Sequence, residues 1–321
     1  MTTTEICIPL ADSRQIYRVE DVERAQEESA LARNEALSSF YERMKALGGT
    51  RFVVKPSRAD AVDPLYDKCP NFDEVIDDVK KSLALAVSGN EPISFAPILL
   101  LGEPGIGKTH FARALAEQLA TGHHFVSMSS LTAGWILSGA SAQWNHAKPG
   151  KVAQALVGGE MANPVIVLDE VDKAGGDSRY DPMGALYELL EHDTARRFRD
   201  EYVDVEIDAS HILWITTAND ERSIPEPILN RMNVYAVPRP DAGESYAIAA
   251  RLYRDLVAAH AWGFPDEPPE DVIERLATLP PREQCRALLA AFGNAKLAGR
   301  DVLVADDVDS FKAGRKRKIG F

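Results

Sequence analysis

The feature that most constrains this chain is a glycine-rich segment that follows a short apolar run. The run is Pro97–Leu101, and the eight residues after it match the spacing GxxxxGK[ST]. A helical pattern follows from Phe111 to Ala120. The glycine-rich segment therefore lies between a strand and a helix, which is the setting that this spacing requires.

The residue types in this segment suit the binding of phosphate. Glycines allow the backbone N–H groups to point inward, and the start of a helix adds further donors. Lys108 is expected to reach the outer phosphates of a nucleoside triphosphate, and the Thr109 hydroxyl to bind Mg²⁺. A glycine-rich turn without a ligand is the alternative, but all consensus positions are filled. We call this segment the phosphate loop; its residues are Gly102, Glu103, Pro104, Gly105, Ile106, Gly107, Lys108 and Thr109.

Length and charge limit the classes of protein to consider. A chain of 321 residues forms one large domain or two domains. The net charge of −13 argues against a protein that is held on nucleic acid by its overall charge. The exception is a basic tail, Arg315–Lys318.

The cysteines and the apolar runs bear on the compartment. Cys7, Cys69 and Cys285 are scattered and show no metal-ligand spacing, so we expect reduced thiols. The first residues lack the order of a signal peptide, and no apolar run approaches the length of a membrane span. We expect a soluble, cytoplasmic protein with no membrane partner.

Short apolar runs alternate with helical patterns through the middle of the chain. This alternation predicts an α/β fold with a parallel sheet and helices on both of its faces. After Asp241 the strand signals fade, and three helical patterns predict a small helical domain. The expected strands are Pro97–Leu101, His124–Met128, Val165–Leu168, His211–Thr217 and Val234–Val237, and the expected late helices are Glu244–His260, Glu270–Leu279 and Arg282–Ala298.

The N-terminal part has a pattern of its own. Residues Glu20–Leu47 repeat apolar side chains at helical spacing, and the segment either packs on the main domain or docks a partner; packing is favoured. Pro56–Pro70 has the composition of a polar linker, and Asn71–Val87 of a helix. We predict an extension and linker over 1–70, a nucleotide-binding domain over 71–239 and a helical lid with the basic tail over 240–321.

Two acids follow the apolar run Val165–Leu168. In open parallel sheets the ligand lies beyond the carboxyl ends of the strands, which is where Asp169 and Glu170 fall. Asp169 is expected to hold Mg²⁺, and Glu170 to polarise the water that attacks the γ-phosphate. A solvated acidic turn is the alternative, and the complete phosphate loop earlier in the chain argues against it.

Asn219 and Arg231 are two further candidates. Asn219 follows a predicted strand, where its amide either orients the attacking water or shapes the next turn. Arg231 precedes the last strand and is a candidate to stabilise the charge that spreads over the transferred phosphoryl group. Position alone does not separate Arg231 from Arg222, from Arg239 or from an ordinary surface ion pair.

Residues from about Asn71 to Ala298 resemble the ATPase part of the Lon family of AAA+ proteins. The resemblance depends on several blocks in the family's order, which are more specific together than one loop. The blocks are Gly102–Thr109, Trp144 through Lys148-Pro149-Gly150, Asn163–Lys173, Asp181-Pro182, Phe198–Tyr202, Thr217–Asn219 and Ile224–Met232.

The resemblance implies a role for each candidate. Asp169 and Glu170 would be the Walker B pair, Asn219 sensor 1, and Arg231 an arginine finger that acts across a subunit interface. A sensor 2 arginine is implied on a helix after Pro280-Pro281. Arg286 fits the family's local pattern slightly better than Arg282, and both also fit ordinary surface charges.

Trp144 lies where the family carries a pore loop that grips its substrate. An indole offers a large aromatic surface that holds many peptide sequences without residue-specific hydrogen bonds. The alternative is a half-buried tryptophan that anchors a loop. Asn145 and His146 replace the apolar residue and glycine that the family usually places there.

The resemblance implies an ATP- and Mg²⁺-dependent ATPase that assembles as a homo-oligomeric ring, with a hexamer expected, and remodels or unfolds a protein substrate. Because the sequence ends shortly after the lid, we expect no Ser-Lys peptidase domain and no intrinsic protease activity. Two alternatives remain. One is a nucleic-acid motor or loader, suggested by the tail from Lys312 to Lys318, and the other an ATP-controlled adaptor or switch.

Overall fold

The computed structural model describes residues 10–29, 34–130, 135–144, 147–174, 181 and 183–308. The predicted basic tail and Cys7 lie outside these residues. The chain forms two compact units. The first combines the described residues up to Val62 with Asp77–Leu101 and Ala112–Ala236, and the second combines Asp63–Ile76, Gly102–Phe111 and the described residues from Val237 onward.

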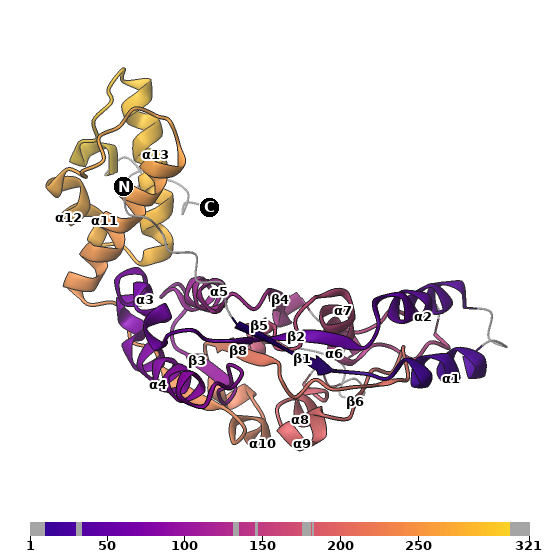
Figure 1. Cartoon of the computed structure of the whole chain (residues 1–321). Coiled ribbons are helices and arrows are strands. Elements are labelled where there is room, and N and C mark those ends of the chain that lie inside the picture. Colours follow the sequence, from indigo (N-terminus) through magenta and orange to yellow (C-terminus); the bar gives the residue numbers. More distant parts are fainter. Residues whose placement is uncertain are drawn as a thin grey trace. The chain divides into compact units, whose positions relative to one another are not determined.

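A five-stranded parallel sheet forms the centre of the first unit (Figure 1), as the sequence predicts. Its strand order is β4-β5-β8-β3-β9. The three inner strands, β5, β8 and β3, are buried runs of mostly β-branched and apolar residues, which suit a sheet covered by helices, whereas most residues of the edge strands β4 and β9 are exposed or partly exposed. Their bounds are β3 Ile98–Leu101, β4 His123–Ser127, β5 Val165–Asp169, β8 Leu213–Ala218 and β9 Asn233–Ala236.

The register brings the ends of β5 and β8 together. Leu168 pairs with Thr216, so Asp169 and Thr217 come next on neighbouring strands. β3 lies on the other side of β8, with Leu101 opposite Ala218. Because all three strands are parallel, their carboxyl ends share one edge of the sheet, which is the edge where ligands bind in open sheets of this kind.

Helices flank the sheet and connect its strands. The apolar faces of several of them join the largest buried cluster of the first unit, for example Leu156 of α7 and Leu186 of α8. The helices of the middle of the chain are α4 Asp73–Gly89, α5 Lys108–Leu119, α6 Trp135–Ser138, α7 Lys151–Gly158, α8 Leu186–Leu189, α9 His192–Ala195 and α10 Glu226–Leu229.

The N-terminal helices pack on the first unit, which confirms the favoured interpretation of this segment. They are α1 Val19–Ser29 and α2 Glu35–Leu47. Val22, Tyr41 and Met44 are buried in the cluster that also holds the sheet residues. The segment is therefore part of the folded body.

Two strands, β1 Leu10–Gln15 and β2 Thr50–Lys55, precede and follow these helices in the chain and pair in an antiparallel way. The sequence pattern does not predict this strand pair. Arg51 of β2 is only 5% exposed and donates to the carbonyl oxygens of Leu156 and Val157, at the end of α7. Polar residues dominate β1, so it has no apolar alternation to reveal it. A second unpredicted pair is β6 Phe198–Arg199 with β7 Glu206–Ile207.

The segment that was expected to be a polar linker is folded. It contains a 3₁₀ turn, Ala59–Val62, and the helix α3 Pro64–Lys68. Val62 and Leu65 are fully buried. Two apolar anchors are enough to fold a segment whose composition is otherwise polar.

Three helices of the second unit share an apolar core and lie close to where the sequence predicts them. They are α11 Ala242–Ala259, α12 Glu270–Ala277 and α13 Pro281–Leu297. A capping box of Asp241 and Glu244 begins α11, which satisfies N–H groups that the helix leaves without partners. Tyr253 and Phe292 are central to the core. Among the helices of the described residues, none is long and apolar enough to span a bilayer.

Candidate functional site

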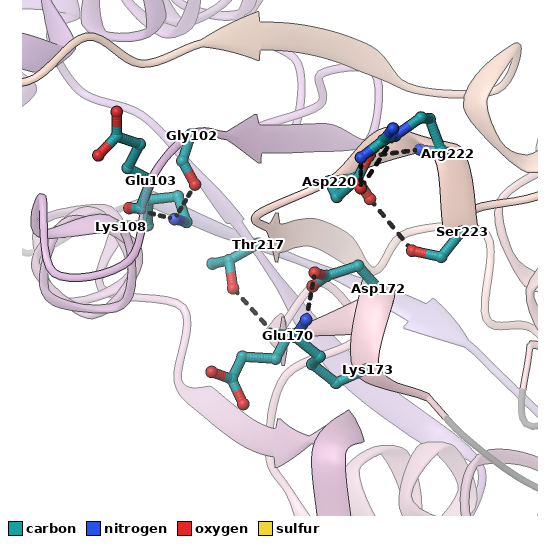
Figure 2. Close-up of polar contacts among 10 residues, drawn as sticks. All are labelled: Gly102, Glu103, Lys108, Glu170, Asp172, Lys173, Thr217, Asp220, Arg222 and Ser223. Atoms are coloured by element: carbon teal, nitrogen blue, oxygen red, sulfur yellow. Dashed lines mark hydrogen bonds and ion pairs between the residues drawn. The ribbon is translucent and has the colours of Figure 1, made fainter.

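The phosphate loop follows β3 directly along the chain and runs into α5. Gly107 has φ +106°, a backbone conformation that side chains with a Cβ rarely adopt. Lys108 is only 7% exposed, and its Nζ donates to the carbonyl oxygens of Gly102 and Glu103 at 2.6 and 2.9 Å (Figure 2). The ammonium group is thus held inside the turn of its own loop.

Aromatic and amide side chains support this loop. The rings of Phe72 and Phe111 stack at 4.3 Å, and a Cβ added to Gly107 would lie 3.7 Å from the Phe72 ring. Asn71 is buried and donates from Nδ2 to the carbonyl oxygens of Ile106 and Pro238. The segment just before α4 therefore holds both the loop and the chain that leads to α11.

Glu103 is an acidic residue within the phosphate loop, where negative charge opposes the binding of phosphate. Its carboxylate accepts from Nε of Arg239 at 2.7 Å and also from Nη2. Both side chains are well exposed, so the pair adds little to stability. It does offset the charge of Glu103.

In the first unit, the acid pair meets a hydroxyl group from the neighbouring strand. The Thr217 hydroxyl donates to Oδ1 of Asp169 at 2.8 Å. It also accepts from the backbone N–H of Glu170 at 3.0 Å (Figure 2). Glu170 has φ +58°, which is uncommon for a residue other than glycine and occurs mainly at constrained, functional positions. One threonine therefore bonds the carboxylate of Asp169 and the backbone of Glu170.

Further polar groups lie near the ends of β5 and β8. Asn219 follows β8 and is half-buried. Asp220 accepts from the guanidinium of Arg222, and these hydrogen bonds lower the pKa of Asp220 to about 2. Asp172 is buried, with Nζ of Lys173 at 3.5 Å from Oδ2. Arg222 thus pairs with Asp220, which lies in the same turn.

The arginine candidates lie in different places. In the first unit, Arg231 is 30% exposed, donates to the carbonyl oxygen of Pro227 at 2.5 Å and has Glu191 at 3.5 Å. In the second unit, Arg282 and Arg286 are exposed on α13. A Cβ added to Gly105 would lie 3.8 Å from Cβ of Arg282, so Arg282 lies beside the phosphate loop.

Trp144 lies in a loop that we call the Trp144 loop, Gly139–Gly150; residues 145 and 146 lie outside the described part. Trp144 is 47% exposed. The ring of Trp135, in α6, meets it edge to face at a centroid distance of 5.4 Å, and Trp135 is itself 36% exposed. Two indoles therefore share one exposed region.

The oxygen donors present fit Mg²⁺ better than a softer metal. Mg²⁺ prefers carboxylate and hydroxyl oxygens. In the first unit, Asp169 accepts a hydrogen bond that fixes its orientation. In the second unit, Thr109 carries a hydroxyl in the first turn of α5. Histidine and cysteine, which would indicate zinc or iron, form no cluster with acids that could hold a metal among the described residues.

Comparison with known proteins identifies the family of this region. Residues 98–238 match the model of the ATPase family associated with various cellular activities (AAA). These residues form an AAA ATPase domain. It is an ATP-binding domain, and it is Lon-like in that it is similar in sequence to part of the Lon proteases.

Relatives of the AAA ATPase domain include Lon proteases. The Lon protease of Finegoldia magna is 38% identical over 181 residues, which are 55% of this chain and 23% of that protein. The human mitochondrial Lon protease homolog is 36% identical over 214 residues, 66% of this chain and 22% of that protein. The chain thus spans about a quarter of the length of these relatives.

Solved structures share the fold of the AAA ATPase domain. Hsp104 of S. cerevisiae, from a complex with casein, has a TM-score of 0.60 and 16% identity, and the match covers 85% of this chain and 51% of that one. A RuvB mutant of Thermotoga maritima has a TM-score of 0.52 and 18% identity, with 74% and 67% covered. At these identities the likeness shows the fold alone.

Several residues that organise the site escape the sequence pattern. Thr217, Asn71 and Phe72 act by contact with residues far away in the chain. No motif marks Asn71 or Phe72, and the block Thr217–Asn219 assigns no role to Thr217. For Thr217 a signal did exist, because a polar residue near the end of a buried strand that neighbours the acid-bearing strand is placed to bond those acids.

Proposed function

We propose that this protein hydrolyses ATP within a ring of identical subunits, a hexamer, and uses the energy to pull on or remodel a polypeptide. The observation that carries the proposal is the complete phosphate loop together with an acid pair fixed at the end of β5. Both belong to a domain of an ATPase family.

We assign the phosphates to the phosphate loop, with Lys108 and the loop amides as donors. Thr109 and Asp169 would hold Mg²⁺, which neutralises phosphate charge and orients the triphosphate when it is bound. Glu170 is the general base that takes a proton from the attacking water. Its constrained backbone, which is also bonded through the N–H group to Thr217, supports a role in which the side chain must start from a defined position.

Three further roles complete the proposal. Asn219 orients the attacking water. Arg231 stabilises the developing charge in the site of the adjacent subunit, which requires exchange of its present contacts with Pro227 and Glu191. Arg282 is the better candidate for the lid arginine because it lies beside Gly105, whereas Arg286 is one helical turn further along α13.

The polypeptide contact is assigned to Trp144. Its indole is exposed and adjoins a second exposed indole, Trp135, which suits a surface that holds apolar side chains of varied sequence. The Lon proteases among the relatives support a polypeptide as the substrate class. Ring assembly is supported by the family, whose members typically form rings.

The decisive experiment compares Glu170→Gln with the parent protein. We expect the variant to bind ATP as tightly as the parent but to hydrolyse it about 100-fold or more slowly, since general-base catalysis contributes 10²–10⁴-fold. Glu221→Gln, an exposed glutamate next to Asp220, is the matched control and should hydrolyse at the parent rate.

The same variant tests the ring and the substrate. With ATP and Mg²⁺ it should elute as a hexamer and retain labelled, unfolded casein, which is recovered intact. Hydrolysis by Glu170→Gln at the parent rate would refute the general-base assignment. A monomer that hydrolyses ATP briskly with Arg231→Ala would refute the shared site, and retention of DNA in place of casein would favour a nucleic-acid motor.

A further inference from the structure

The Trp144 loop is closed at its base. A Cβ added to Gly150 would lie 2.4 Å from the backbone nitrogen of Gly139, so the two ends of the loop touch. The N–H of Ala140 donates to the carbonyl oxygen of Lys148 at 3.3 Å, which closes the next step. The described ends of the loop therefore meet, as the ends of an Ω-loop do.

A single buried carboxylate lies against both ends. Oδ2 of Asp200 accepts from the backbone N–H of Gly150 at 2.7 Å. At the other end, a Cβ on Gly139 would fall 2.3 Å from Oδ1 of Asp200, so only glycine allows this approach. The neighbouring N–H of Glu201 donates to the carbonyl oxygen of Ser138 at 2.7 Å.

The same carboxylate is bonded to the turn of the β6–β7 hairpin. Its Oδ1 accepts from the backbone N–H groups of Tyr202 and Val203 at 2.9 and 3.1 Å. α2 supports the hairpin from a different direction, because the Tyr41 hydroxyl donates to the carbonyl oxygen of Val203 at 2.8 Å. Asn34, which caps α2, donates to Ala142 in the loop at 3.4 Å.

Asp200 is completely buried, and burial of a carboxylate is costly. An ordinary polar turn does not need a buried carboxylate. Here each oxygen of the carboxylate bonds a different segment, and the two segments are 50 residues apart in the chain. The Asp200 carboxylate therefore links the Trp144 loop to the β6–β7 hairpin.

We propose that Asp200 is a positioning residue that fastens the Trp144 loop to the β6–β7 hairpin, so that a load on Trp144 passes into the folded body instead of bending the loop. The inference rests on the proposed function, in which Trp144 contacts the polypeptide. Asp200 itself touches neither polypeptide nor nucleotide.

Two substitutions distinguish the contact of Asp200 with the Trp144 loop from its contact with the β6–β7 hairpin. Asp200→Asn keeps the shape but replaces one acceptor oxygen by an N–H₂ group, which faces a donor. Asp200→Ser leaves one oxygen for the turn, while its shorter side chain no longer reaches Gly150. The matched control is Asp204→Asn in the same turn, where the exposed acid pairs with Arg199 at 3.0 Å and its φ of +52° suits asparagine.

Hydrogen exchange measures the fastening directly. In both Asp200 variants we expect backbone amides of residues 139–150 to exchange about tenfold or more faster, since a charge-assisted hydrogen bond is lost. Amides of β3, β5 and β8 should keep the parent rates, and Asp204→Asn should match the parent throughout. Parent rates in the loop of both Asp200 variants would overturn the inference.

A second measurement tests the consequence for the substrate. With unfolded casein as the probe, the ratio of stimulated to basal ATP turnover should fall in both Asp200 variants, and half-maximal stimulation should need about tenfold more casein. If Trp144→Ala abolishes stimulation while both Asp200 variants retain it, the inference is wrong and the proposed function stands. If Trp144→Ala is stimulated like the parent, the proposed function fails, and the exchange rates alone decide whether Asp200 fastens the loop.

Discussion

The phosphate loop and the Trp144 loop both turn the chain sharply, but they are held in different ways. In the phosphate loop, Lys108 bonds carbonyl groups five and six residues before it. In the Trp144 loop, the fastening group is Asp200, 50 residues from its partner Gly150. A loop closed by its own residues leaves a contiguous motif, and a loop closed from a distance leaves none.

The comparison assumes that the two loops are independent of each other. Lys108→Ala tests this assumption, and it is the substitution with the largest expected effect. Removal of the ammonium should weaken the binding of a fluorescent ATP analogue about 100-fold or more, because charge-assisted bonds to phosphate are lost. Lys81→Ala, an exposed lysine of α4 that pairs with Asp78, is the control and should bind as the parent does. Faster hydrogen exchange in residues 139–150 of Lys108→Ala would contradict independence.

A smaller effect would show how the Trp144 loop presents its side chain. Trp135→Ala removes the ring that meets Trp144 edge to face, a contact worth about 0.5–1.5 kcal/mol, or about two- to tenfold in affinity. The measurement is the anisotropy of labelled casein with ATP in the Glu170→Gln background. Trp135→Phe keeps an aromatic ring and should recover most of the affinity. Equal affinity of Trp135→Ala and the parent would show that Trp135 plays no part.

Local sequence patterns predict those strands and helices whose own residues show an apolar run or repeat. The run Val165–Leu168 is apolar throughout because β5 is buried on both faces, and the inner strands β3 and β8 show the same kind of run. The edge strands β4 and β9 give shorter apolar signals, which still predict them. β1 was missed because its residues are polar and it is recognisable only by its pairing with β2. Val62 and Leu65 are too few to mark a folded segment in a polar stretch.

The candidate site divides in the same way. The spacing of the phosphate loop and the acids after β5 are visible in the sequence, and both lie within the residues that match the family model. Thr217 and Asp200 fall within the blocks Thr217–Asn219 and Phe198–Tyr202, but the sequence indicates no role for them, because their importance lies in hydrogen bonds to other strands and loops. The roles of the phosphate-loop residues, of Asp169 and Glu170, of the arginines, of Asn219 and of Trp144 stay predictions, as do the predicted domain ranges.

A last expected effect concerns pH. Burial raises the pKa of Asp200 from 3.8 to about 6, with Glu201 contributing, although three N–H groups oppose the shift. The folded protein therefore keeps this proton at pH values where the unfolded chain has released it, so this group makes the free energy of unfolding fall as the pH rises from about 4 to about 6.

Denaturant titrations at several pH values across this window measure the effect. Asp200→Asn should remove this part of the slope. Asp220→Asn should retain it, because Arg222 holds the pKa of Asp220 at about 2, and the stability from that pair is present above 3.8 and lost only as the pH falls toward 2. An identical slope in the parent and Asp200→Asn would rule out titration of Asp200 here.

The carbonyl groups that surround the Lys108 ammonium have a consequence for exchange of nucleotide. In the proposed function, an incoming triphosphate would compete with the oxygens of Gly102 and Glu103 for the same cation, so its affinity would be the difference between two sets of bonds. The same competition would help the product to leave, because the lysine would regain its internal partners as the phosphates depart. The proposal therefore implies that the carbonyl groups of the turn act as internal ligands that limit how tightly the nucleotide binds.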